Sequence, residues 1–156
     1  MLAWNDQSSV YWKSHLEAHP NLLELPCDIG GAKNAQEFVR HIWGSELRWA
    51  QRLAGAPETP REKVPAGPLA TLFELHTQAI QVYRGLLAAP EHTWSDPYVL
   101  TFDWVPLDQR TVSRRKFAGH ALFHSQRHWA QLATLVRNAG FPSEFRGDLL
   151  FSPALT

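Results

Sequence analysis

The segment from Gly119 to Gln131, which reads GHALFHSQRHWAQ, restricts the possible folds of this chain more than any other stretch. It contains three histidines, His120, His124 and His128, each four residues from the next. On an α-helix this spacing puts all three side chains on one face, about one turn apart. The segment therefore predicts a helix whose histidine face lies against other helices or against a bound ligand.

Four segments of the chain carry apolar residues at helical spacing, at residues 2–19, 34–53, 68–89 and 111–138. Proline or glycine follows each of them, and little of the remaining sequence has strand character. The pattern predicts an all-α fold, a four-helix bundle, with residues 1–156 forming a single domain. Asn34 with Glu37 three residues later predicts a capped start for the second helix, and Thr111 or Ser113 is a candidate cap for the fourth.

Two long connections interrupt the helical pattern. Residues 56–67 form a proline-rich, charged loop, and residues 91–110 form an aromatic-rich one. Such lengths permit crossover connections, so a simple up-down-up-down order is not required. The run YVLTFDWV (Tyr98 to Val105) predicts a short hairpin or an extended lid between the third and fourth helices. Leu149, Leu150 and Phe151 in the tail are expected to pack back onto the bundle.

The charge balance and the cysteine content exclude several classes of protein. Fifteen basic residues balance fifteen acidic ones, so we expect no nucleic-acid partner and no membrane-surface partner. Cys27 is the only cysteine, which rules out an intrachain disulfide and a thiolate zinc cluster. The N-terminal residues lack the pattern of a signal peptide, and no apolar run is long enough for a membrane span. We therefore expect a cytoplasmic protein.

Histidines on two helices indicate a metal site. A His-x-x-x-His pair on a helix can give two imidazoles to one ion, and His41 lies on the apolar stripe of the second helix. Three histidines in a helical row span about 12 Å, so one ion can take only two neighbours from that row. The alternative is that each histidine is an ordinary hydrogen-bonded residue of the core or surface.

Other side chains are candidates for the same site or for its surroundings. Glu46 points about 140° around the helix from His41 and is not expected to be a ligand. Arg48 shares the direction of His41 and either holds an anionic substrate or extends to solvent. His76 is expected in the core or a pocket. Four tryptophans are expected to fill the core, two of which (Trp12 and Trp49) are also candidates for a pocket lining: Trp12, Trp43, Trp49 and Trp129.

Three stretches resemble the DinB/YfiT-like superfamily. HIWGSELRWAQRL (His41 to Leu53) is similar to the second helix of that family, which opens with a metal-binding histidine. HSQRHWAQ (His124 to Gln131) is similar to the family's His-x-x-x-His pair followed by glutamine, and GFPSEFRGDLLFS resembles the tail of many members. The resemblance implies a four-helix bundle, a divalent metal held by His41, His124 and His128, and a homodimer.

The resemblance also implies a class of chemistry. Some members of the family are similar to S-transferases or isomerases that use a low-molecular-weight thiol, which would act here as co-substrate of a metal-dependent enzyme. Zinc and nickel suit an all-imidazole site. His120 is the candidate catalytic residue, or else a pocket or second-shell residue. The alternatives are metal-assisted hydrolysis and a non-enzymatic stress-response protein that binds a metal or another small ligand.

Overall fold

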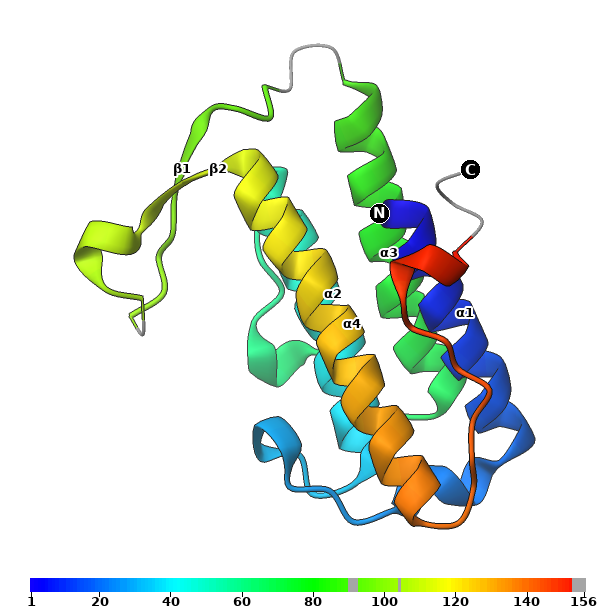
Figure 1. Ribbon diagram of the computed structural model, residues 1–156. Helices are drawn as coiled ribbons and strands as arrows, with labels where there is room; N and C mark the ends of the chain where they lie inside the picture. The colour runs from blue at the N-terminus through cyan, green and yellow to red at the C-terminus, as the bar shows by residue number, and fades with distance from the viewer. Residues whose placement is uncertain (90–92, 104, 153–156) are drawn as a thin grey trace.

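The computed structural model describes residues 1–89, 93–103 and 105–152. Its described part contains four long α-helices: α1 (Leu2–Ala18), α2 (Ala35–Leu53), α3 (Leu69–Ala88) and α4 (Arg114–Asn138). Short 3-10 turns lie between them and in the tail, at Pro20–Glu24, Ile29–Gly31, Arg61–Lys63, Leu107–Gln109 and Leu149–Phe151. The predicted all-α bundle is confirmed (Figure 1).

The helices do not alternate in direction. In Figure 1, α1 and α4 run one way along the bundle and α2 and α3 run the other way. The connection between α2 and α3 therefore returns along the length of the bundle, as the long proline-rich loop permits. This loop carries the turn Arg61–Lys63 past the middle of α2.

Local signals fix the starts of the two helices that carry the candidate site. The side chain of Asn34 accepts a hydrogen bond from the backbone N–H of Glu37 at 2.9 Å, and Glu37 in turn accepts from the N–H of Lys33. Ser113 accepts from the N–H of Lys116 at 3.1 Å, so α4 begins at Arg114 and not at Thr111. Each cap satisfies a backbone donor that would otherwise have no intrahelical partner.

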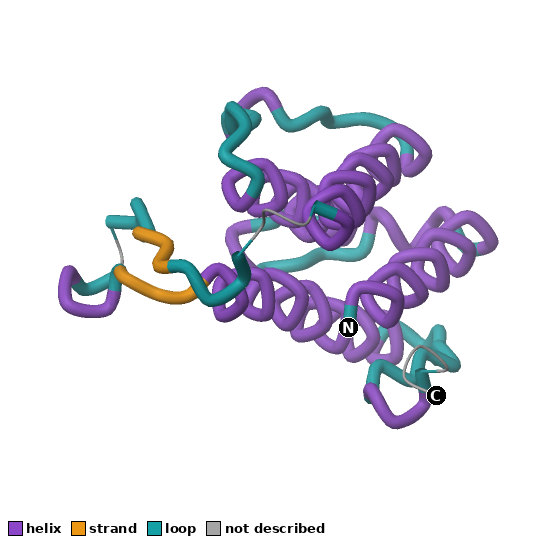
Figure 2. Tube along the Cα trace, turned by 90° about the horizontal axis from the view of Figure 1, so that it is seen from above, coloured by secondary structure: helices purple, strands orange, loops and turns teal. Residues whose placement is uncertain are grey.

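A two-stranded hairpin lies between α3 and α4. Strand β1 (Pro97–Val99) pairs antiparallel with β2 (Thr111–Ser113), and the hairpin projects from one end of the bundle (Figures 1 and 2). The hairpin was predicted, but its second strand was expected inside the run that ends at Val105 and lies further along the chain. Thr111 to Ser113 form the second strand, and Ser113 at its end is also the N-cap of α4.

Aromatic residues fill the core, where Trp12, Trp43 and Trp129 are fully buried. Trp12 stacks on Trp129 with ring centroids 5.9 Å apart, which places it in the core and not in a pocket lining. The tail packs through Phe145 against Trp12, at 5.3 Å between ring centroids. The expectation for the end of the tail was wrong in part, since Leu150 and Phe151 are 94% and 57% exposed.

No helix in the described ranges has both the length and the apolar character needed to cross a membrane.

Candidate metal centre

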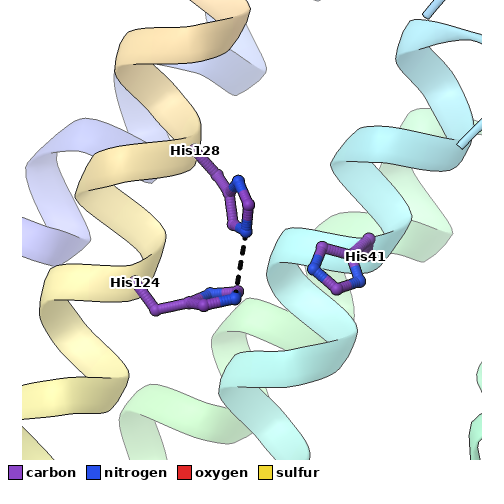
Figure 3. A group of neighbouring side chains, drawn as sticks. All are labelled: His41, His124 and His128. Atoms are coloured by element: carbon purple, nitrogen blue, oxygen red, sulfur yellow. Dashed lines mark hydrogen bonds between the residues drawn. The ribbon is translucent and has the colours of Figure 1, made fainter. Parts of the chain in front are cut away.

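His41 of α2 and His124 and His128 of α4 converge between the two helices (Figure 3). One nitrogen from each ring can be chosen so that all three lie within 4.8 Å of one another. The Nε2 atoms of His124 and His128 are 3.0 Å apart, and the ring centroid of His41 lies 5.5 Å from that of His124 and 5.1 Å from that of His128. The His124–His128 pair and His41, which is distant in the sequence, therefore face the same point.

The two ring nitrogens of His128 have different partners. Nδ1 lies 2.6 Å from the side-chain oxygen of Gln131, which can only accept, so Nδ1 carries the proton. Nε2 then has the free lone pair, and it faces His124 and also a guanidinium nitrogen of Arg127 at 3.4 Å. This is the arrangement by which metal-bound histidines are oriented in proteins, with the second nitrogen donating to a neighbouring acceptor.

Aromatic side chains support the other two rings. Trp49 contacts His124 edge to face at 4.4 Å between centroids, and Phe38 lies 5.1 Å from His128 and 6.5 Å from His41. The Nδ1 atom of His124 is buried and has no hydrogen-bond partner among the described residues. An unpartnered buried nitrogen is costly, and since Nε2 of the same ring faces His128, an ion in the cluster would bind Nε2 and leave this cost in place.

The site keeps its imidazoles neutral at neutral pH. Burial, followed by the neighbouring His128, lowers the pKa of His41 to about 4, and the same two causes with His41 lower the pKa of His124 to about 2. Burial also lowers the pKa of His128, against the opposing effect of its hydrogen bond to Gln131. Metals bind the neutral form of imidazole, so the site is in its ligand form without losing protons.

The donor set fits a divalent ion. Zinc–nitrogen bonds of about 2.0–2.1 Å put two ligand nitrogens roughly 3.3 Å apart in a tetrahedral site. The His124–His128 pair is already near that separation at 3.0 Å, and a nitrogen of His41 lies within 4.8 Å of a nitrogen of each of these two rings. Three neutral nitrogens without a thiolate suit zinc, nickel and other borderline metals.

A cavity of about 460 Å³ opens beside the histidines. His41, His124 and Trp49 line it together with arginines of α2 and residues of both neighbouring loops. Gly30 in the loop before α2 has a φ of +64°, which suits glycine, and a Cβ added there would lie 3.8 Å from Nε2 of His41, an ordinary contact distance. The cavity has a volume typical of sites for small molecules.

These features, and the order of the helices, agree with a comparison against known families. A family model described as the DinB superfamily matches residues 8–132. The chain belongs to the DinB superfamily. A search of curated proteins and a search of solved structures each gave no match.

Two other histidines of this DinB chain lie outside the three-histidine cluster. His120 is exposed near the start of α4, with its ring centroid 5.3 Å from Trp49 and 6.2 Å from His124, so its catalytic role stays a prediction. His76 is buried as expected, but on the other side of α2, where its Nδ1 lies 2.7 Å from the carboxylate of Glu46. Glu46 is correspondingly not a neighbour of the cluster, as its helical direction indicated.

The helical periodicity of the sequence did not identify two residues of the site, Gln131 and Arg61. Gln131 follows the histidine pair in the family motif, but its hydrogen bond to His128 depends on a rotamer that the sequence does not specify. Arg61 lines the cavity from a loop, where no helical spacing gives its direction. The only available signal was the charge of the proline-rich loop that carries it.

Proposed function

We propose that this DinB protein is a metal-dependent enzyme that uses His41, His124 and His128 to hold a divalent ion, and that it catalyses a thiol-dependent S-transfer or isomerisation. The observation that supports the proposal best is the position of three imidazole nitrogens within 4.8 Å of one another beside an open cavity. Zinc and nickel are the ions that we expect, and a low-molecular-weight thiol is the proposed co-substrate.

A divalent metal bound to the three nitrogens would supply Lewis acidity that deprotonates a coordinated thiol. The remaining tasks belong to residues of the protein. His41 and His124 line the cavity, and Trp49 packs edge to face against the ring of His124. In the S-transfer the thiol sulfur forms a bond to an electrophilic carbon, and the leaving group departs with the electrons of the broken bond.

The surroundings favour an enzyme over a structural metal site. Closed structural zinc sites have four protein ligands, whereas catalytic sites keep one position for water or substrate. In the described residues the cluster contains no fourth His, Cys, Asp or Glu. Two of its three histidines line the cavity, so a small molecule can reach them from there.

His120 is the proposed acceptor of the thiol proton. Its ring lies beside Trp49 and His124, and the partial burial of this otherwise exposed ring, followed by the charge of Arg127, lowers its pKa, so it is neutral and able to accept a proton at neutral pH. If the reaction is instead a hydrolysis, His120 would activate the attacking water.

Metal content and thiol turnover together test the proposal. We expect about one zinc or nickel ion per chain by elemental analysis, in line with a single three-ligand site. His41→Ala and His124→Ala should each lose most of the metal. The loaded chain should consume a low-molecular-weight thiol in the presence of an electrophile such as 1-chloro-2,4-dinitrobenzene, and removal of the metal should stop the reaction.

His120→Ala is the matched control, because this exposed residue lies on the same helix face outside the cluster. It should keep the metal and lose about 10²–10⁴-fold in turnover if it transfers the proton. Full retention of metal in both ligand variants would refute the site. Turnover that does not need metal, or no turnover across a panel of thiols, would refute the thiol chemistry.

A further inference from the structure

The wall of the cavity next to the histidines is positively charged. Four of the described lining residues are arginines (Arg40, Arg48, Arg52 and Arg61), and two are glutamates (Glu37 and Glu58). With neutral histidines, the lining has two positive charges in excess. A concave, partly desolvated surface of one sign raises the local concentration of oppositely charged ligands.

Two of the four guanidinium groups are held by the protein itself. Arg40 donates from Nε and Nη2 to the backbone carbonyl of Val64 and from Nε to that of Pro65, which fastens the proline-rich loop to α2. Arg52 pairs with Glu58 and lies 4.4 Å over the ring of Phe102. These contacts give Arg40 and Arg52 structural tasks.

The other two guanidinium groups keep donors for a ligand. Arg48 shares Glu58 with Arg52 through one terminal nitrogen, and its Nε is buried without a hydrogen-bond partner among the described residues. The side chain of Arg61 is exposed and makes no hydrogen bond or ion pair with any residue that the structure describes, while its backbone carbonyl accepts from the N–H of Val64. Arg48 lies two helical turns from His41 on the same face of α2, and its side chain lines the cavity with 26% of its surface exposed.

The two arginines and the metal-site histidines share one space. Arg48 and Arg61 line the same cavity as His41 and His124, and the charges of both arginines contribute to the low pKa of His41 after burial and His128. A small molecule in a cavity of about 460 Å³ would contact both ends at once. Guanidinium groups bind carboxylates through paired, charge-assisted hydrogen bonds, which also fix the orientation of the ligand.

We infer that the substrate of this site carries a carboxylate, which Arg48 and Arg61 bind while its reacting end lies at His41 and His124. The inference deepens the proposed function by naming a substrate class, and it rests on that function only for the reaction. Binding of the carboxylate requires the arginines and not the metal. An experiment can therefore refute the carboxylate site without refuting the proposed reaction, and the reverse.

Calorimetric titration of the full-length chain with succinate, at low ionic strength, tests the inference. Succinamide, the uncharged isostere, should bind at least about tenfold more weakly. Arg61→Gln removes a guanidinium group that has no hydrogen-bond partner in the described structure. The variant should therefore keep its fold and bind succinate at least about tenfold more weakly. Arg48→Gln should weaken succinate binding to the same extent. Arg48→Lys should restore only part of the affinity, because lysine lacks the paired donors of a guanidinium group.

Arg137→Gln is the control for a general charge effect, because Arg137 is exposed at the end of α4 and does not line the cavity. It should bind succinate like the unaltered chain. Each titration is run on zinc-loaded and on metal-free protein. Undiminished binding in the Arg48→Gln/Arg61→Gln double variant, equal binding of succinamide, or no binding of succinate would overturn the inference. Succinate binding that disappears with His41→Ala but survives the double variant would assign the carboxylate to the metal and would also overturn it.

Discussion

His128 shows how one residue of this DinB protein can have two partners with opposite requirements. Its Nδ1 donates to Gln131 at 2.6 Å, and its Nε2 presents a lone pair to His124 and to the point where the three rings meet. Without Gln131 the ring could adopt either tautomer and could rotate about its last bond. The glutamine therefore selects the nitrogen that is available to a metal.

Gln131→Leu tests this role at the scale of a single hydrogen bond. We expect the variant to fold normally and to bind zinc about 10–100-fold more weakly, because a hydrogen bond to the other ring nitrogen holds the ligand ring in place. Competition with a chromogenic chelator measures the affinity. Gln131→Glu keeps an acceptor for Nδ1 and should retain most of it. Equal affinity of the leucine variant and the unaltered chain would show that the hydrogen bond does not orient His128.

At the scale of elements, the position of the proline-rich loop against α2 shapes the cavity. Gly44 lies in the middle of α2, and a Cβ at this residue would be 2.8 Å from a methyl group of Val64. The loop can approach this closely only because the helix has no side chain there. Arg61 precedes Val64 in the same loop, so this packing also holds one of the two proposed carboxylate ligands in the cavity wall.

Gly44→Ala should therefore destabilise the protein although alanine favours helices. We expect a loss of about 1–3 kcal/mol in the free energy of unfolding, measured in urea, because Val64 must move. Gly85→Ala in α3 is the matched control, since nothing lies within 4 Å of its added Cβ. It should gain about 0.5–1 kcal/mol from helix propensity alone. A similar gain for Gly44→Ala would mean that the loop is not packed against α2 in this way.

At the scale of the whole molecule, a buried polar network joins all four helices. Asn5 of α1 donates to Glu46 of α2 at 2.7 Å, Glu46 faces His76 of α3 at 2.7 Å, and Gln126 of α4 donates to Asn5 at 3.1 Å. His76 also lies 3.1 Å from Asp6, which pairs with Arg84 at the surface. Each helix contributes at least one polar group, so the network favours a single relative arrangement of the four.

The network should make stability depend on pH. Burial lowers the pKa of His76, but its hydrogen bonds and charge interactions with Glu46 and Asp6 outweigh this, and the net pKa is raised. The folded state thus binds the proton more tightly than the unfolded chain does. Its stabilising effect is complete below pH about 6.5, the ordinary histidine value, and is lost as the pH rises through the raised pKa.

Glu46→Gln tests this dependence because glutamine has the same shape and can still bond to Asn5 and to a neutral His76. We expect it to cost on the order of 1–3 kcal/mol near pH 6, where the unaltered chain has a charged partner for His76. The difference between the two proteins, from urea unfolding at pH 6 to 9, should shrink as the pH rises. A difference that stays constant or grows would show that His76 is not protonated in the folded state near pH 6.

Much of this architecture is a local property of the sequence. Helix periodicity, the caps at Asn34 and Ser113 and the spacing of His124 and His128 depend on neighbours within a few residues, and the sequence alone predicted them. The direction of His41 on its helix, and the exclusion of Glu46 from the same face, followed from the same geometry. The inward direction of His41 and the resemblance to a family together predicted that His41 joins the pair.

Only the tertiary structure decided the parts that depend on the meeting of distant segments. The place of Arg61 in the cavity wall depends on a loop without a repeating geometry, which packs at Gly44. The pairing of His76 with Glu46, and the packing of the tail through Phe145 and not Leu150, likewise depend on which helices become neighbours. Helical periodicity gives the face on which a side chain lies, but the residue it meets across the bundle is set by the packing of the whole chain.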